Sequence, residues 1–178
     1  MANIIRRGQV ARENWPRLDE PALRELAQRA GASRPENGGH PVTGILVPLA
    51  LWRSQRSLCA ALGVETGILV REDDDPADVA SEFAHVAVLA IEFPKFTNGR
   101  GYSMARLLRA RYGYRGELRA VGDVLRDQLF YMARVGFDAF ELRADQDAQQ
   151  ALRAFSDFTQ CYQASTDQPL PLFRRRAA

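Results

Sequence analysis

Lysine is almost absent from this chain of 178 residues. Lys95 is the only one, and arginine supplies every other long basic side chain. An ammonium is a compact point charge that can lose its proton when desolvated, whereas a guanidinium is a planar fork that stays charged. The single lysine therefore makes its own segment, residues 93–103, the first candidate for a binding site.

Cysteine and histidine are also scarce, with two residues of each. Two thiolates cannot supply the four ligands that an iron–sulfur cluster usually takes, and two imidazoles disfavour a zinc site. Cys59 and Cys161 lie far apart in the sequence, and we expect both to be free thiols that pack as small apolar groups. We assign no metal and no cofactor from these residues.

Long apolar runs and a strong net charge are missing too. No stretch approaches the roughly 20 apolar residues that cross a bilayer, and residues 1–7 lack the apolar core of a signal peptide. The net charge is only +2, from 24 basic and 22 acidic residues. We therefore expect a cytoplasmic protein with neither a membrane nor a nucleic acid as its partner.

Strand-like and helix-like segments alternate regularly from residue 42 onward. The expected strands are 42–47, 66–70, 86–93, 117–121 and 139–142, and the expected helices are 51–62, 76–84, 102–112, 124–135 and 147–163. Five strand–helix units in a row predict an α/β fold with a mostly parallel five-stranded sheet. That sheet is either open, with helices on both faces, or partly closed as an incomplete barrel.

The two ends of the chain have a different character, although we expect one domain over residues 1–178. Residues 1–41 form an N-terminal β/α extension, with a strand pair at 3–12 that turns at Gly8, a helix at 21–30 and a loop at 31–41. Residues 165–178 form an irregular tail, because prolines at 169 and 171 oppose regular structure. The tail either packs across the domain or docks onto a partner.

The loops that follow parallel strands meet at one edge of a sheet, where α/β proteins usually bind their ligands. The loop with Lys95 has glycines that permit close backbone approach or positive φ, and it precedes a helix whose first amides favour anions. We therefore expect a small oxyanion or carboxylate to bind at Lys95, Thr97, Asn98, Gly99, Arg100, Gly101, Tyr102, Ser103 and Arg106. Two alternatives are a simple turn with solvated charges and a lysine that forms a Schiff base.

A second strand–helix junction supplies supporting residues. Asp123 is expected to cap a helix or to orient a cation such as Lys95 or Arg126, and Gln128 to donate a hydrogen bond to a ligand. The acidic run 72–75 has the composition of a magnesium site, but Asp75 before Pro76 has the sequence of a helix cap. We favour the cap.

Three blocks of this sequence resemble a bacterial family of uncharacterised proteins. They are Phe93-Pro94-Lys95-Phe96-Thr97-Asn98-Gly99-Arg100-Gly101-Tyr102-Ser103 with the following Ala105 to Arg109, then Leu118 to Gln128, then Gly136 to Arg143. The resemblance extends over roughly residues 42–176. Members of that family carry the label of oxidoreductases involved in sulfite reduction and are usually encoded near sulfite reductase. The resemblance implies a role in sulfur assimilation, but it supplies no catalytic residues.

Residues 97–108 are also similar to the glycine–tyrosine–serine stretch of barrel-fold cyclic-dinucleotide phosphodiesterases. Those enzymes hold metals with an acidic pair before that stretch, where this chain has Pro94, Lys95 and Phe96. The similarity therefore supports barrel-like architecture and not that activity.

Three functions follow as hypotheses. The first is an accessory protein of assimilatory sulfite reduction with a small-oxyanion site at the Lys95 loop. The second is a non-catalytic binding partner of sulfite reductase or a related sulfur-assimilation enzyme. The third is a flavin- or nicotinamide-dependent oxidoreductase, although the sequence has no recognisable motif for either cofactor. Whether the protein is an enzyme is left open.

Overall fold

The computed structural model describes residues 2–29, 36–37 and 39–176. The strands are β1 (Ala2–Arg6), β2 (Gln9–Glu13), β3 (Glu36–Asn37), β4 (His40–Pro41), β5 (Gly44–Pro48), β6 (Glu65–Val70), β7 (Val88–Phe93), β8 (Glu117–Gly122) and β9 (Ala139–Glu141). The α-helices are α1 (Glu20–Arg29), α2 (Leu49–Ser54), α3 (Arg56–Ala61), α4 (Pro76–Ala80), α5 (Arg100–Ala110), α6 (Leu129–Val135), α7 (Ala148–Ala151) and α8 (Leu172–Arg175). Two 3₁₀ turns, η1 (Arg126–Gln128) and η2 (Leu152–Ser156), precede α6 and follow α7.

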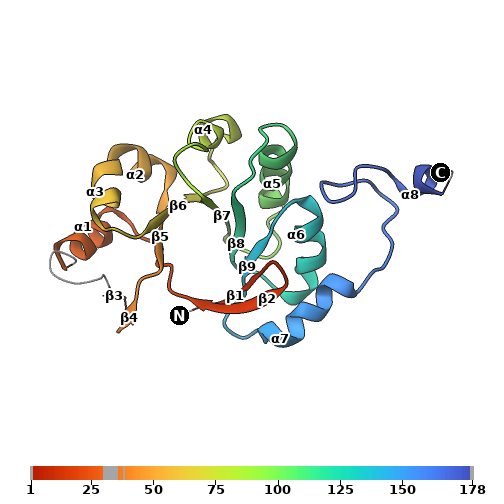
Figure 1. The fold of residues 1–178 in the computed structure, drawn as a ribbon, viewed down its shortest axis with the longest axis horizontal. Helices are drawn as coiled ribbons and strands as arrows, with labels where there is room; N and C mark the ends of the chain where they lie inside the picture. Colours follow the sequence, from red (N-terminus) through yellow and green to blue (C-terminus); the bar gives the residue numbers. More distant parts are fainter. Residues whose placement is uncertain (1, 30–35, 38, 177–178) are drawn as a thin grey trace.

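A curled sheet forms the centre of the protein. In the described chain it has seven strands in the order β2-β1-β9-β8-β7-β6-β5. Strands β5 to β9 are parallel and adjacent in chain order, and β1 is antiparallel to both β9 and β2. Right-handed crossovers between successive neighbours place the helices on one face, so the sheet curls into a half-barrel with α2 to α6 on its convex side (Figure 1).

This topology confirms the predicted parallel βα repeat and corrects two details. The alternative with helices on both faces of an open sheet is wrong, because no strand order reverses between β5 and β9. The sheet is also larger than the predicted five strands, since the hairpin β1–β2 joins it instead of forming a separate extension. Sequence periodicity located the hairpin but could not show which edge it would extend.

A stretch that we call the strap, Asn14–Leu18, links the two edges of the sheet. It follows β2 at one edge and hydrogen-bonds to β5 at the other, through Leu46 N to Pro16 O at 3.0 Å and Leu18 N to Leu46 O at 2.9 Å. The strap therefore crosses the concave face and encloses it.

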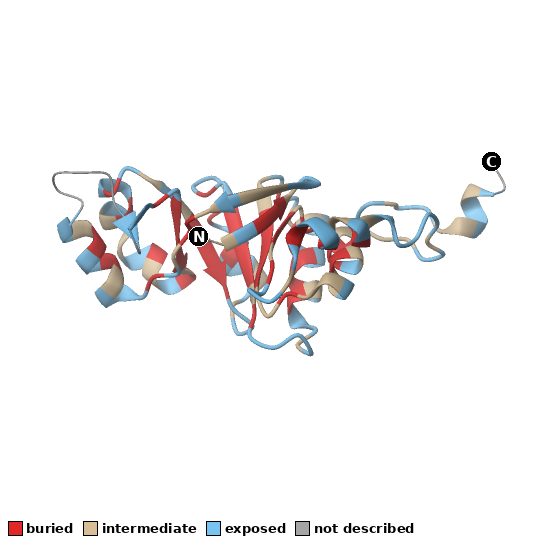
Figure 2. Ribbon diagram, turned by 90° about the horizontal axis from the view of Figure 1, so that it is seen from below, coloured by how far each residue is buried: buried red, intermediate tan, exposed pale blue. Residues whose placement is uncertain are grey.

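Buried side chains fill both faces of the sheet. In β7, Leu89, Ile91 and Phe93 pack against the helices, whereas Val88 and Ala90 face the concave side. This strand is thus apolar on both of its faces. On the concave side the strap contributes Trp15, which packs with Leu46, Leu69, Val88, Ala90 and Val121. Figure 2 shows that the central strands are largely buried.

Several predicted helices are shorter than their periodicity indicated. Gln55 divides the predicted helix 51–62 into α2 and α3, and the predicted helix 147–163 ends as the 3₁₀ turn η2. Phe158 and Tyr162 lie within the range of that predicted helix, but they are 64% and 62% exposed. The chain leaves the body after η2, so no sheet surface is available to bury them.

The last described part of the chain, residues 157–176, is an arm that projects from the body (Figures 1 and 2). The tail was predicted to be irregular, but α8 begins directly after Pro171. Proline lacks the N–H that a residue inside a helix donates, but this loss has no cost at the start of a helix. Residues 177–178, and 30–35 and 38 of the predicted loop 31–41, lie outside the described residues.

Cys59 is buried, Cys161 is half-buried, and both are free thiols. No described helix is long and apolar enough to cross a membrane.

Candidate functional site

The Lys95 loop, residues 94–99, connects β7 to α5 at the carboxyl edge of the sheet. Lys95, Thr97 and Gly99 are exposed there. In the part of the chain that the structure describes, the Lys95 ammonium has neither a hydrogen-bond nor an ion-pair partner. Its charge is therefore available to a molecule from solution.

Asp123 fixes this loop to the neighbouring strand ends. Its Oδ2 accepts a hydrogen bond from the backbone N–H of Phe96 at 2.9 Å, and its Oδ1 accepts one from Arg143 Nη1 at 2.9 Å. Its own N–H donates to Phe93 O at 2.8 Å. One carboxylate thus joins the ends of β7, β8 and β9. The predicted helix cap is wrong, because the Asp123 carboxylate bonds to the Lys95 loop and the following turn η1 begins after Leu125. The cation that Asp123 orients is Arg143 and not Lys95 or Arg126.

Arg143 is held by two carboxylates. Besides Asp123, it pairs with Asp145 through Nε to Oδ1 at 2.7 Å and Nη2 to Oδ2 at 2.8 Å. The hydrogen bond from Arg143 is the main reason that the pKa of Asp145 is lowered to about 2. The carboxylates, Asp145 before Asp123, raise the pKa of Arg143. The positive charge of the Arg143 guanidinium is thus already balanced by two carboxylates.

Gln128 also holds the loop. Its Nε2 donates to Phe96 O at 2.9 Å, while its Oε1 accepts from Leu125 N at 3.0 Å. Together Gln128 and Asp123 satisfy both backbone groups of Phe96. Gln128 thus donates a hydrogen bond within the protein, and the predicted donation to a ligand stays a prediction.

The acidic run 72–75 faces the other end of the loop. Asn98 donates through Nδ2 to Glu72 Oε2 and accepts from Arg100 N at 3.0 Å, which caps the first amide of α5. Arg100 Nη1 lies 3.8 Å from Asp73 Oδ1. Asn98 and Arg100 therefore lie beside carboxylates, which oppose anion binding at this end.

Of the two roles predicted for the glycines of the motif, positive φ is wrong, and close backbone approach to a ligand stays a prediction. Neither glycine has a positive φ, and a Cβ on Gly101 would lie 2.5 Å from Phe93 Cζ, so Gly101 allows helix α5 to pack against β7. A Cβ on Gly99 would meet nothing within 4 Å. The glycine that requires its conformation is Gly122, with φ of +100° and a Cβ position 2.4 Å from Phe93 O. Sequence analysis did not identify it as special.

The remaining predicted residues are spread over the surface around the loop. Tyr102 packs edge-on against Phe93, with 5.4 Å between ring centroids, and burial raises the pKa of its phenol, with Asp127 adding to the effect. Ser103 and Arg106 are exposed on α5. Arg126 pairs with Asp157 at 2.9 Å, at the start of the arm, so it does not join the Lys95 loop.

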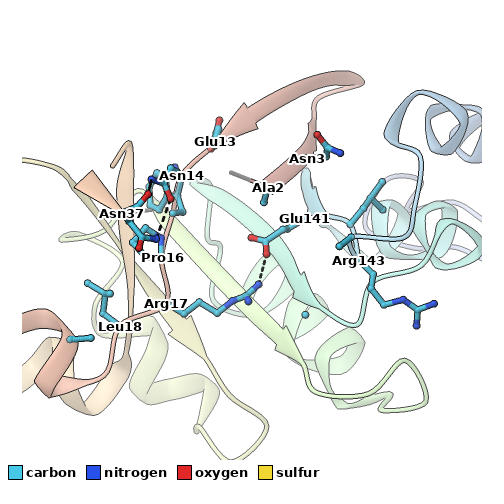
Figure 3. Close-up of a pocket in the computed structure, with 15 residues that line it drawn as sticks. Ala2, Asn3, Glu13, Asn14, Pro16, Arg17, Leu18, Asn37, Glu141 and Arg143 are labelled. Atoms are coloured by element: carbon cyan, nitrogen blue, oxygen red, sulfur yellow. Dashed lines mark hydrogen bonds and ion pairs between the residues drawn. The ribbon is translucent and has the colours of Figure 1, made fainter. Parts of the chain in front are cut away.

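A hollow that the sequence did not predict lies at the same edge of the sheet (Figure 3). It has a volume of about 890 Å³ and lies between the strap and the carboxyl ends of β8 and β9. Arg17 reaches from the strap across the hollow to Glu141, with 2.5 Å between Nη2 and Oε1, whereas Arg143 points away from that pair (Figure 3). No sequence signal marked the hollow, because it exists only once the strap pairs with β5.

The lining of this hollow favours binding over nucleophilic catalysis. Its described residues are Ala2, Asn3, Glu13, Asn14, Trp15, Pro16, Arg17, Leu18, Ala22, Asn37, Gly122, Glu141, Leu142, Arg143 and Ala144. None of them has a hydroxyl, thiol, amine or imidazole, and the carboxylates of Glu13 and Glu141, which could act as nucleophiles, are already paired with arginines. The Asn14 amide already donates to the carbonyls of Asn37 at 3.2 Å and His40 at 3.0 Å, so it shapes the strap.

Below the hollow, a buried ion network closes the interior. Arg119 is fully buried and donates through Nε to Glu117 Oε1 at 2.7 Å and through Nη2 to Glu13 Oε2 at 3.2 Å. Trp15 is also in contact with Gly44, where an added Cβ would lie 2.5 Å from its ring. The inside of the half-barrel is therefore filled, so a ligand on its concave side would bind at the rim.

The acidic run also has the predicted capping role. Asp75 Oδ1 accepts from Ala77 N at 2.7 Å at the start of α4, which confirms the cap. Among the described residues, no group of three or more histidine, cysteine, aspartate or glutamate side chains is arranged to hold a metal ion.

The fold and the rim define an α/β half-barrel with charged side chains at its carboxyl edge. The sequence profile of the family described as "Bacterial protein of unknown function (DUF934)" matches residues 67–173, from β6 to α8. This match covers more than half of the chain, so the protein belongs to that family. No curated protein and no solved structure matched the chain. Membership of a bacterial family is thus confirmed, whereas the link to sulfite reduction stays a prediction.

Proposed function

We propose that the protein is an accessory protein of assimilatory sulfite reduction that binds a small oxyanion at the Lys95 loop. The observation that carries this proposal is the Lys95 ammonium, which has no partner in the described chain, on a loop that is held at the Phe96 backbone and at the Asn98 side chain. The sulfur-assimilation role itself rests on the resemblance of residues 93–143 to the family encoded near sulfite reductase.

The charges around the loop reduce the number of cations that could bind an oxyanion. Three cations near the rim already have carboxylate partners: Arg143 pairs with Asp123 and Asp145, Arg100 with Asp73, and Arg126 with Asp157. Of the cations predicted for the site, only Lys95 and Arg106 have no such partner in the described chain. An oxyanion would therefore take its counter-charge from Lys95 first, with Arg106 on the following helix as the second cation.

The anchored backbone supports this role for a physical reason. Asp123 and Gln128 hold Phe96, and Glu72 holds Asn98, so the residues on either side of Thr97 do not have to be ordered when a ligand arrives. A binding loop that is ordered in advance loses less conformational entropy on binding.

Isothermal titration with sulfite, sulfate and a nucleotide sulfate tests the proposal. We expect Lys95→Ala to weaken binding by about tenfold, which corresponds to about 1.4 kcal/mol. Arg115→Ala is the matched control, because Arg115 is an exposed cation that precedes β8 at the opposite edge of the sheet. Absence of heat with all three anions, or equal effects of the two substitutions, would contradict the oxyanion site.

A second candidate function is a non-catalytic partner of sulfite reductase. The observation that favours it is the projecting arm, which carries four of the large apolar side chains that are exposed in the described chain. Co-purification separates the two candidates: truncation after Gln168 would abolish association with the reductase, while Lys95→Ala would leave it intact. A visible absorption spectrum of the purified protein tests the third hypothesis, a flavin or nicotinamide oxidoreductase.

A further inference from the structure

The arm, residues 157–176, is anchored to the body at its base. Arg134, which is buried at the end of α6, donates through Nη2 to Gln163 O at 2.6 Å. The carbonyl of Arg134 in turn accepts from Ser165 Oγ at 2.8 Å and Thr166 N at 3.1 Å. The direction in which the arm leaves the body is therefore set by specific contacts with α6.

The tip of the arm is held by contacts within the arm itself. Leu172 N donates to Tyr162 O at 3.0 Å, and Arg175 donates to Cys161 O at 2.8 Å and Gln160 Oε1 at 3.2 Å. These bonds fix helix α8 against residues 160–162. The tip is thus an ordered element, which reduces the entropy lost when it binds a partner.

Apolar side chains are concentrated on this arm. Of the seven large hydrophobic residues that are exposed in the described chain, four lie on it: Phe158, Tyr162, Leu170 and Phe173, at 64%, 62%, 49% and 56% exposure. Single exposed apolar residues are ordinary, but a cluster on one projecting element marks an interaction surface. Aromatic and arginine side chains are also the residues that most often dominate interface energies.

The charge of the tip indicates the chemistry of its partner. Residues 169–176 contain three arginines and no acidic residue. Arg175 is used inside the arm, and the Arg174 guanidinium lies 5.9 Å from the centroid of the Phe173 ring. In the described chain, Arg174 and Arg176 have no carboxylate partner. A partner surface that is complementary to this tip would be an apolar groove with acidic residues on its rim.

On a second copy of this chain, the apolar hollow beside the arm does not match that groove. This hollow, of about 450 Å³, is lined by Phe137, Phe140 and Phe155 and has the cation Arg7 and the carboxylate Asp138 at its edge. Asp138 is already paired with Arg109 at 3.1 Å. The remaining free charge there has the same sign as Arg174 and Arg176, so it would repel them.

We propose that the tip of the arm, with Phe173 as its apolar anchor and Arg174 and Arg176 as its charged flanks, docks into an acidic-rimmed apolar groove on a different protein. This inference rests on the second candidate function for the expectation that a protein partner exists. It adds the surface that makes the contact and the chemistry of the surface that receives it.

Photocrosslinking of the full-length protein in its native host tests the proposal. Phe173 is replaced by p-benzoylphenylalanine, and Tyr131, which is 54% exposed on the body, is replaced likewise as the matched control. We expect an adduct from position 173 that exceeds the control, and an about tenfold loss of that adduct when Arg174 and Arg176 are both changed to glutamate. Circular dichroism of the purified variants verifies that they fold.

Three outcomes would overturn the proposal: no adduct at position 173, an adduct that survives the charge reversal, or an adduct with twice the mass of the chain. Mass spectrometry of the adduct separates this inference from the second candidate function. Sulfite reductase in the adduct supports both. A different protein in a charge-dependent adduct supports the docking tip and contradicts the reductase as the partner.

Discussion

The guanidinium of Arg119 lies 4.6 Å from the centroid of the Trp15 ring, in the interior of the half-barrel. Arg119 comes from β8 and Trp15 from the strap, so the contact joins the middle of the sheet to the segment that crosses its concave face. This stack, with Glu13 and Glu117 as the counter-ions, occupies the space in which a complete barrel would bury its own side chains.

Replacing Trp15 with alanine should therefore destabilise the protein strongly. The ring is buried against Gly44 and Arg119, and its loss leaves a cavity beside a buried charge. We expect a loss of about 3–5 kcal/mol in the free energy of unfolding, measured by urea denaturation. Tyr131→Ala is the control for an exposed ring and should cost much less. Similar losses for both would show that the strap does not seal the interior.

The two glycines of the Lys95 motif give a matched pair of substitutions. Gly101→Ala places a Cβ 2.5 Å from the Phe93 ring, whereas Gly99→Ala places one in open space. Because Phe93 is buried in the core, we expect Gly101→Ala to cost about 1–3 kcal/mol in stability, while Gly99→Ala is nearly neutral. Thermal unfolding of both variants measures the difference. A destabilised Gly99→Ala beside an unchanged Gly101→Ala would refute this assignment.

Asp123 is expected to control the order of the Lys95 loop. In Asp123→Ala, the Phe96 amide loses its acceptor and Arg143 loses one of its two carboxylates. Hydrogen exchange at residues 94–99 should become about tenfold faster, because the loop opens more easily. The control is Asp73→Ala, which removes an exposed carboxylate at the other end of the same loop. If exchange stays at the wild-type rate without Asp123, another contact holds the loop.

Acid should weaken the protein partly through Glu82. Burial raises the pKa of this carboxyl, but hydrogen bonds from Arg53 and Trp52 outweigh burial and lower it below its ordinary value of 4.5. Below pH 4.5 the unfolded chain therefore binds a proton that the folded protein excludes. The stability that Glu82 contributes is present above that pH and is lost as the pH falls through the lowered pKa.

Glu82→Gln tests this linkage, since glutamine cannot take up the proton. Urea unfolding between pH 7 and pH 3 should show a lower stability at neutral pH and a shallower decline on acidification than in the wild type. Asp78→Asn is the control, because Asp78 also contacts Arg53 but is exposed. A wild-type slope in the Glu82 variant would assign the acid sensitivity to other carboxylates.

Local patterns predicted much of the fold. Three features depend on residues close together in the chain. They are the apolar run of β7, the capping of α4 by Asp75 and the turn of the β1–β2 hairpin. The Lys95 loop was placed correctly at a strand end for the same reason. Predictions failed where a distant segment decided the result, as for Phe158 and Tyr162, which follow helical spacing but stay mostly exposed because the chain leaves the body.

For the candidate site, too, the sequence predicted some features and not others. The residue types on the Lys95 loop were visible in the sequence, but their partners were not, because Asp123 reaches Arg143 and not the nearer Arg126. The hollow beside Arg17 was invisible, since the strap and β9 are separated by more than a hundred residues along the chain.

The sequence by itself determined which segments become strands and helices and where the single ammonium lies, because these follow from short-range periodicity and turn chemistry. Only the tertiary structure decided that the helices share one face, that the strap closes the concave side with Trp15, and that the arm leaves the body. Those outcomes depend on which surfaces remain to be buried once the sheet has curled, and no local stretch of the chain contains that information.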